Sequence, residues 1–473
     1  MQRKTGSIIA LGVTAIVALK LFVFGLAYPL TSRLSGDPYH YLLIAESLTD
    51  FSSVLSYAGD RSIGIPFFEY LIRKILNLFS ANQSVLTWVN AIGIALLITH
   101  IATSWLFSRW AKSSNFIQYE LTAVCLFIFL ATYPALIGHM ISPLSDALSV
   151  DLIACAFMSM HVAMTSNIRY QTFLFGSMSA LFFGFSILVR PGNLTGVFAA
   201  LFAAIAISFL TRHSKAVVIC AIALGGGLII TPSYYNCNLK YGGVCLQSPA
   251  TFNVIASVQA GLRGARILWK HGSTPLIPIP ILPDETMFQT FHQPCQLKTV
   301  SGIDDSSLTG CLSARPLYLP SYVVKKWIGL FDHFHFAPSL EVITPSWLRW
   351  MSRAYGSFAW IGLSLFFLTM AQATTRTCRQ EIKGKLVKPI VPLALAVYSM
   401  VMLAQHTVLH TEDRYGFPLI PLCAVMLAIY CEKLIVGYRT YGFKSQAPLF
   451  LFCIVAWAIF IAQVVIWDNS KFY

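Results

Sequence analysis

The sequence predicts an all-α protein that crosses a membrane many times, and three observations indicate this fold class. Hydrophobic residues make up 56% of the 473 residues, whereas charged residues make up 11%. Soluble globular proteins carry about 25% charged residues. The mean hydropathy is +0.67, and apolar stretches of about 20 residues, the length of a membrane helix, recur along the chain. An ordinary soluble domain is therefore excluded.

The formal net charge of +14 indicates which partners to expect. In a membrane protein, an excess of Lys and Arg favours contact with anionic lipid headgroups or phosphates and reflects a bias towards cytoplasmic loops. No RNA- or DNA-binding motif accompanies this charge. We therefore expect membrane lipids, and no nucleic acid, among the partners.

Eleven apolar segments are predicted to span the membrane. The first follows Met1-Gln2-Arg3-Lys4. It is too long for a signal peptide and lacks a small-residue cleavage site, so we interpret it as a retained anchor. The fifth and sixth segments are separated only by Arg190-Pro191-Gly192-Asn193 and form either two spans or one broken hairpin. The predicted spans are 7–29, 84–107, 118–138, 147–165, 173–189, 194–211, 216–232, 355–373, 388–409, 416–432 and 447–467.

Lysines and arginines in the short links predict the orientation of the chain. If the N-terminus is cytoplasmic, the basic stretches 376–388 and 433–444 are cytoplasmic as well, and the short outer links hold only Arg190 and Arg414. The expected parts are an N-terminal transmembrane catalytic module, a large extracytoplasmic loop and the C-terminal transmembrane helices, over residues 1–232, 233–354 and 355–473.

Two segments on the predicted outer side are too long to be simple connectors. The first, 30–83, contains an amphipathic helical pattern from Phe67 to Leu76 that suits the membrane interface. The second, 233–354, contains four cysteines whose spacing allows the pairs Cys237–Cys245 and Cys295–Cys311. Such bridges suit an oxidising compartment, but spacing alone does not establish the connectivity.

Three aspartates lie at or near the ends of predicted spans, where a charge is costly and needs a reason. Asp37, in Ser35-Gly36-Asp37-Pro38, is either a helix cap or a catalytic carboxylate beside the membrane surface. Asp146, in Ser142-Pro143-Leu144-Ser145-Asp146, has the same two interpretations. Asp151 lies further along the fourth predicted span, so we interpret it as buried support.

The link between the ninth and tenth spans holds an unusual density of ionisable groups. It reads His410-Thr411-Glu412-Asp413-Arg414-Tyr415 and is either a solvated turn or an anion site in which Arg414 holds a phosphate. Arg61 and Arg190 are two further candidate cations on the outer side. Carboxylates and arginines together suit the transfer of a group from a phosphate ester. A carboxylate deprotonates the acceptor hydroxyl, and arginines stabilise the departing phosphate.

The order of these motifs resembles the GT-C superfamily of integral-membrane glycosyltransferases. The likeness is to the protein O-mannosyltransferase and lipid A aminoarabinose transferase group, and in length and layout also to serotype-converting O-antigen glucosyltransferases. The matching elements are an Asp-x-x-x-Tyr-x-x-x-Ala pattern, an arginine before a Gly/Pro-containing apolar stretch, and a His-x-Glu-x-Arg-Tyr-x-x-Pro-x-x-Pro element, which here begin at Asp37, Arg61 and His410.

The resemblance implies a GT-C-like bundle of about eleven transmembrane helices with two large extracytoplasmic loops. It implies that Asp37 is the catalytic base and that Asp146 assists acceptor or metal binding. Arg61, Arg190 and Arg414 are then expected to contact the donor phosphate. A divalent cation is left open as a cofactor, because Pro38 follows Asp37 where relatives often carry a second acidic residue. The supporting residues in this scheme are Tyr41, His410, Glu412 and Tyr415.

The predicted activity is an inverting transfer of a hexose or pentose from a polyprenyl-phosphate carrier. The acceptor would be a lipid-linked glycan, lipopolysaccharide or another envelope molecule at the outer face of a bacterial inner membrane. A transporter or flippase of lipid-linked sugars is an alternative, but it would place charges at mid-membrane and repeat its halves; Lys20 is the clearest mid-span charge. An envelope polysaccharide polymerase is a second alternative, which the pair Arg263 and Arg266 fits in part.

Overall fold

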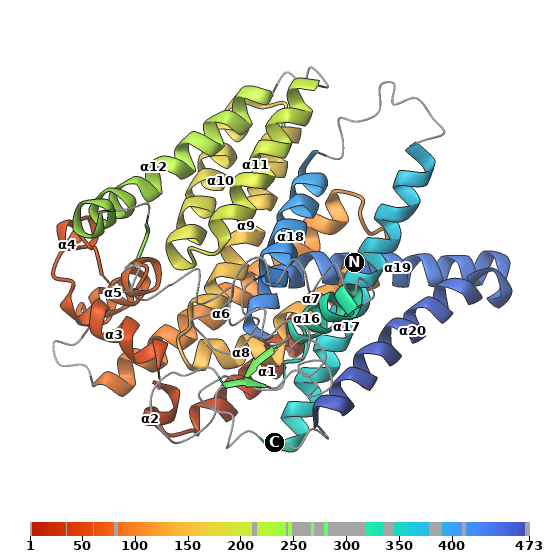
Figure 1. Cartoon of the computed structure of the whole chain (residues 1–473), viewed down its shortest axis with the longest axis horizontal. Helices are drawn as coiled ribbons and strands as arrows, with labels where there is room; N and C mark the ends of the chain where they lie inside the picture. Colours follow the sequence, from red (N-terminus) through yellow and green to blue (C-terminus); the bar gives the residue numbers. More distant parts are fainter. Residues whose placement is uncertain are drawn as a thin grey trace.

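The structure is a computed structural model, and it shows a bundle of α-helices (Figure 1). Among the described residues, the exception is a small antiparallel pair of strands, β1 (Arg266–Leu268) and β2 (Ile279–Ile281), in which Arg266 lies opposite Ile281. The predicted all-α class is therefore confirmed. The residues that the structure describes are 2–34, 36–59, 61–79, 84–210, 215–242, 245–247, 266–268, 279–281, 318–333, 345–377, 390–408 and 413–468.

The helices follow the chain in an order close to that of the predicted spans. They are α1 (Gln2–Leu26), α2 (Leu30–Arg33), α3 (Asp37–Ser47), α4 (Phe51–Leu55), α5 (Gly64–Asn77), α6 (Val85–Ser113), α7 (Glu120–Ala131), α8 (Pro134–Ile141), α9 (Ser145–Thr165), α10 (Arg169–Val189), α11 (Asn193–Leu210), α12 (Ala216–Tyr241), α16 (Tyr318–Gly329), α17 (Ser346–Thr377), α18 (Ile390–Val408), the 3₁₀ helix η2 (Asp413–Leu419), α19 (Ile420–Tyr441) and α20 (Phe443–Asp468).

Within the described ranges, eight helices are long and apolar enough to cross a membrane: α6, α9, α10, α12, α17, α18, α19 and α20. The third predicted span is a bent pair, because α7 and α8 meet at 40°. Pro134, which opens α8, cannot donate the hydrogen bond that would continue α7. The first and sixth predicted spans are the shorter apolar helices Ala10–Leu26 and Asn193–Phe209. Each predicted span thus has its helix, and the protein is a multi-pass membrane protein.

Helix α9 is the central element of the bundle. In the most apolar 18-residue stretch of α9, 78% is buried within the protein. In the corresponding stretch of α20, which lies at the edge of Figure 1, the buried share is 22%. Ala154 of α9 packs into a core formed mainly by helices of the N-terminal half, and Phe157 packs into a second core formed mainly by later helices. Helix α19 is shared in the same way, since Ala424 belongs to the first core and Cys423 to the second. The two shared helices therefore hold the two cores together.

The predicted outer segment 30–83 folds into short helices α2 to α5. The expected amphipathic helix is present as α5, which buries Ile65 and Tyr70 and exposes Leu71 and Ile75. In the second outer segment, the predicted Cys237–Cys245 disulfide is present. Cys295 and Cys311 lie outside the described residues, as do most of 233–354 and Arg263.

A carboxylate on α19 fixes the start of α7, a helix that packs against it. Glu432 accepts hydrogen bonds from the backbone N–H groups of Gln118, at 2.8 Å, and Tyr119, at 2.6 Å. The hydroxyl of Thr122 donates to the same carboxylate at 3.3 Å. A negative charge at a helix N-terminus satisfies the free N–H groups and the helix dipole, so this contact ties the N-terminal and C-terminal halves together.

Helix α16 carries a buried lysine, Lys326, that is hydrogen bonded to the end of α18. Lys326 is fully buried and donates to the carbonyl oxygen of Thr407 at 3.0 Å, while the indole of Trp327 donates to the Thr407 hydroxyl at 2.9 Å. Burial lowers the pKa of Lys326 from 10.5 to about 7. The folded protein therefore binds this proton more weakly than the unfolded chain does.

This lysine gives a testable pH dependence of stability. Between about pH 7 and pH 10.5 the unfolded chain keeps the proton of Lys326 while the folded protein releases it, so stability should rise with pH by up to about 1.4 kcal/mol per unit. Lys326→Met should flatten this rise, and Lys444→Met, at an exposed position, should not. Thermal unfolding in detergent across this pH range measures both; an equal slope in Lys326→Met and the parent would contradict the assignment.

Candidate functional site

Asp37 is the first residue of α3, and its carboxylate faces two arginines. The preceding Gly36 occupies the N-cap position with φ +76°, a conformation that glycine adopts without strain, and no side chain caps this helix. Oδ1 of Asp37 lies 2.7 Å from Nη2 of Arg61, and Oδ2 lies 3.5 Å from Nη1 of Arg414. The interpretation of Asp37 as a helix cap is therefore wrong. Its side chain stays 22% exposed and is therefore accessible to solvent.

Tyr41 lies one helical turn after Asp37 and joins α3 to the start of α9. It is buried, and its hydroxyl lies close to the side chain of Ser145. Burial raises the pKa of Tyr41, and the nearby carboxylate of Asp37 raises it further. Tyr41 therefore stays protonated and acts as a hydrogen-bonding group rather than as a base.

Asp146 lies in the first turn of α9 and is almost fully buried. Its Oδ1 is paired with Nη1 of Arg190, and its Oδ2 lies 3.4 Å from Nδ1 of His139. The helix makes no side-chain cap bond at its N-cap residue, Leu144. The capping interpretation is therefore wrong for this residue too, and its carboxylate serves as the partner of a buried arginine.

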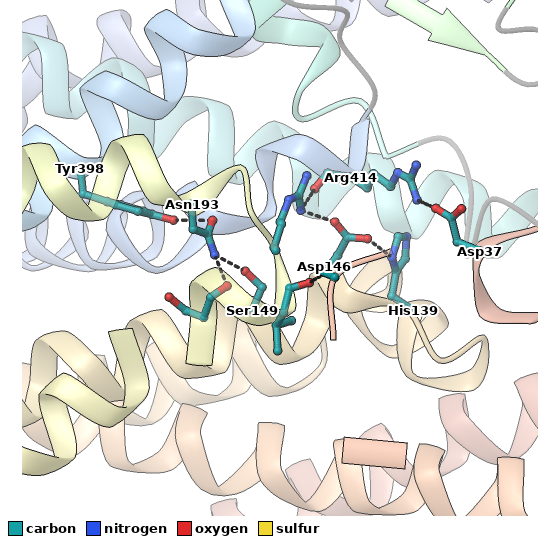
Figure 2. A network of polar contacts seen from close by, with 11 residues as sticks. Asp37, His139, Asp146, Ser149, Asn193, Tyr398 and Arg414 are labelled. Atoms are coloured by element: carbon teal, nitrogen blue, oxygen red, sulfur yellow. Dashed lines mark hydrogen bonds and ion pairs between the residues drawn. The ribbon is translucent and has the colours of Figure 1, made fainter. Parts of the chain in front are cut away.

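Arg190 and Arg414 meet over one aromatic ring. The guanidinium of Arg190 lies 4.9 Å from the centre of the Tyr415 ring, and that of Arg414 lies 5.6 Å from it. Nη1 of Arg190 also donates to the carbonyl oxygen of Arg414 at 3.5 Å. The ring of His406 stacks on Tyr415 at 4.9 Å. These contacts join the Asp146–Arg190 pair to the Asp37–Arg414 pair in one network (Figure 2).

A close backbone approach explains how Arg61 reaches this network. A Cβ on Gly64 would lie 2.5 Å from the carbonyl carbon of Leu188 and would also overlap the amide nitrogen of Val189. The hydroxyl of Ser62 donates to the carbonyl oxygen of Val189 at 3.2 Å. The start of α5 therefore packs directly on the end of α10, one residue before Arg190, and the predicted arginine-plus-glycine motif has a structural reason.

Several polar residues of the network were not predicted. Asn193 donates to the hydroxyl of Ser149 at 2.7 Å and accepts from the hydroxyl of Tyr398 at 3.2 Å, which extends the network into the bundle (Figure 2). His139 is the unpredicted partner of Asp146. Ser149 could have been found from the sequence, because it lies one helical turn after Asp146 on the same helix. The others carry no local signal, because their partners lie on distant segments.

A buried arginine holds the segment that leads to Asp146. Arg33, at the end of α2, is 1% exposed and donates to the carbonyl oxygen of Ile141 at 3.2 Å and to Oδ1 of Asn90 at 2.9 Å. Ile141 ends α8, four residues before α9 begins. This contact fixes the turn between His139 and Asp146 relative to α2 and α6.

Two of the predicted supporting residues, His410 and Glu412, lie outside the described residues. In the part of the chain that is described, no group of three or more His, Cys, Asp or Glu residues has the arrangement of a metal site. Asp37 and Asp146 each face arginines instead. The residues described therefore do not fit a divalent cation, and we derive no step through one.

No known family model matches the sequence, and no curated protein matches it. Two solved structures of oligosaccharyltransferase from Archaeoglobus fulgidus, the first of them described as archaeal AglB, are similar to this chain. One, in complex with an inhibitory peptide and a dolichol-phosphate, has a TM-score of 0.49 and 13% identity, and covers 98% of this chain and 55% of the enzyme. The other, the apo form, has a TM-score of 0.47 and 12% identity, and covers 97% and 55%. This chain thus spans little more than half the length of those chains.

Proposed function

We propose that the protein is a GT-C-type glycosyltransferase that moves a sugar from a polyprenyl-phosphate carrier to a hydroxyl group of an envelope acceptor. The acceptor class is a lipid-linked glycan or lipopolysaccharide, at the extracytoplasmic face of a bacterial inner membrane. The observation that carries the proposal is the convergence of Arg61, Arg190 and Arg414, from three distant segments, around the carboxylates of Asp37 and Asp146.

The position of the network supports a lipid-borne substrate. Helix α9 begins at Ser145 and α19 begins at Ile420, whereas α10 ends at Val189 and α18 ends at Val408. The network joins residues at these four ends, so it lies at one end of the bundle, at the level where membrane helices enter water. A phosphate headgroup is held at this level while its prenyl chain stays in the bilayer.

The arrangement supports a direct displacement. The acceptor oxygen forms a bond to the anomeric carbon as the bond from that carbon to the phosphate oxygen breaks, which inverts the configuration. Asp37 accepts the proton of the acceptor hydroxyl. The phosphate leaves with the bonding electron pair, and Arg61, Arg190 and Arg414 stabilise its charge. Asp146 holds Arg190 in place and takes no proton in this scheme.

A transfer assay in liposomes tests the proposal. The parent protein should convert one member of a panel of polyprenyl-phosphate sugars, in the presence of envelope lipid extract, into a product with a new glycosidic bond, detected by mass spectrometry. Arg414→Gln should lower kcat/KM for the donor by about 10²- to 10³-fold. Arg109→Gln is the matched control, because Arg109 also forms an ion pair, with Glu120, but lies outside the network. A labelled donor that changes leaflet without forming a new bond would instead indicate a transporter.

A further inference from the structure

His139 contacts the network at a point that the proposed reaction leaves unexplained. Its ring is 2% exposed, and its Nδ1 lies 3.4 Å from Oδ2 of Asp146. Both atoms are buried, and neither has a hydrogen-bonding partner within the described ranges. A buried carboxylate oxygen without a donor is costly, and Nδ1–H of His139 is the donor within reach. A small rotation of the ring or of the carboxylate closes this hydrogen bond.

The other side of the His139 ring is fixed by Phe417 of η2, which belongs to the predicted element that begins at His410. His139 meets the ring of Phe417 edge-on, with centroids 4.8 Å apart. Phe417 lies in η2, three residues after Arg414. In Figure 2 the His139 side chain rises between Asp146 and Asp37, beneath Arg414. The imidazole is therefore held between α8, the start of α9 and η2, with its Nδ1 edge towards the carboxylate.

The contacts form a chain from His139 through Asp146 to Arg190, one of the three arginines of the proposed phosphate site. His139 faces Oδ2 of Asp146, while Oδ1 of the same carboxylate is paired with Arg190. A carboxylate held at both oxygens cannot rotate, so the guanidinium paired with it keeps one direction. Without the histidine, the contacts of Asp146 among the described residues leave its carboxylate paired with Arg190 alone, the arginine that it should orient.

We propose that His139 is a positioning residue, which holds Asp146 so that Arg190 is aimed at the phosphate of the polyprenyl-phosphate donor. This inference rests on the proposed function, since it assumes that Arg190 binds that phosphate. His139 takes part through Asp146 and does not touch the reacting atoms. Its loss should therefore weaken donor binding and leave the folded bundle intact.

Binding of polyprenyl phosphate without a sugar tests this role apart from turnover. His139→Phe keeps a ring against Phe417 but has no donor, so the affinity should fall about tenfold to a hundredfold, as for the loss of a hydrogen bond to a charged group. His139→Asn places an N–H close to the position of Nδ1 and should restore most of the affinity. In the background of Arg190→Gln, His139→Phe should have no further effect, because it acts through that arginine.

The bundle offers a matched control in a second buried histidine–aspartate pair. Nδ1 of His100 lies 2.9 Å from Oδ1 of Asp151, away from the arginines. His100→Phe should lower thermal stability and leave the affinity for polyprenyl phosphate unchanged. Equal affinity of His139→Phe and the parent would overturn the inference, as would a full additional loss on top of Arg190→Gln. If the parent itself does not bind polyprenyl phosphate, the proposed function fails first, and the positioning role fails with it.

Discussion

Asp37→Asn is expected to abolish sugar transfer while the bundle stays folded. Asparagine has nearly the same shape as aspartate but cannot accept the proton of the acceptor hydroxyl. Loss of a positioned general base costs about 10²- to 10⁴-fold in rate. The binding of polyprenyl phosphate should persist or strengthen, because Arg61 and Arg414 lose the carboxylate that now competes with the phosphate for them.

Initial rates of transfer, at matched expression and thermal stability, measure this effect. Asp50→Asn is the control, because Asp50 is a true helix cap: its side chain accepts from the backbone N–H of Ser53 at 2.8 Å. That variant should transfer sugar at the rate of the parent. If Asp37→Asn is as active as the parent, Asp37 is not the base and the proposed mechanism is wrong.

Gly64→Ala is expected to reduce transfer about a hundredfold, although residue 64 has no side chain in the network. The added methyl group would lie within 2.6 Å of the carbonyl oxygen of Leu188 and would also overlap the amide of Val189. These are backbone atoms and cannot rotate away, so the start of α5 must separate from the end of α10. A displacement of about 1 Å between reacting groups costs about 10²-fold, and Arg61 and Arg190 lie on the two sides of this contact.

Gly64→Ala should also lower the free energy of unfolding, by about 1–3 kcal/mol as for other overpacked sites. Gly227→Ala is the matched control, since a Cβ there meets no atom within 4 Å. That variant lies inside α12 and should be neutral or more stable by up to about 1 kcal/mol, because alanine favours a helix over glycine. Transfer rates and melting temperatures of Gly64→Ala and Gly227→Ala measure both effects. Parent-like activity of Gly64→Ala would show that the close approach does not position the arginines.

The membrane spans could be predicted from the sequence because a bilayer imposes a length and a polarity on each helix, independent of the neighbours. The bend at Pro134 was not predicted, since the apolar run from 118 to 138 continues through it. Asp37 was ambiguous for a local reason. An aspartate before a proline reads as a cap, and the structure shows that Gly36 takes that position instead.

In the candidate site, too, the residues with a local signal in the sequence could be predicted, whereas their contacts with distant segments could not. Arg61, Arg190 and Arg414 stood out because charges near membrane spans are rare, and the structure brings all three to the aspartates. Their pairing was not predictable, because each contact joins segments that are far apart in the sequence. Polar residues such as Asn193 and Tyr398 were missed because a single polar residue in an apolar run has many ordinary explanations.

The distance in sequence between Asp37 and Arg414, 377 positions, has a consequence for the synthesis of the protein. A chain emerges from the ribosome N-terminus first, so the aspartate enters the membrane long before its second arginine has been made. Arg61 is available early, but Arg414 arrives only with η2, after α18 has been inserted. Until then the growing chain holds its proposed base without a complete phosphate site. A truncated or stalled product would therefore lack the complete site, and under the proposed mechanism it would not transfer a sugar.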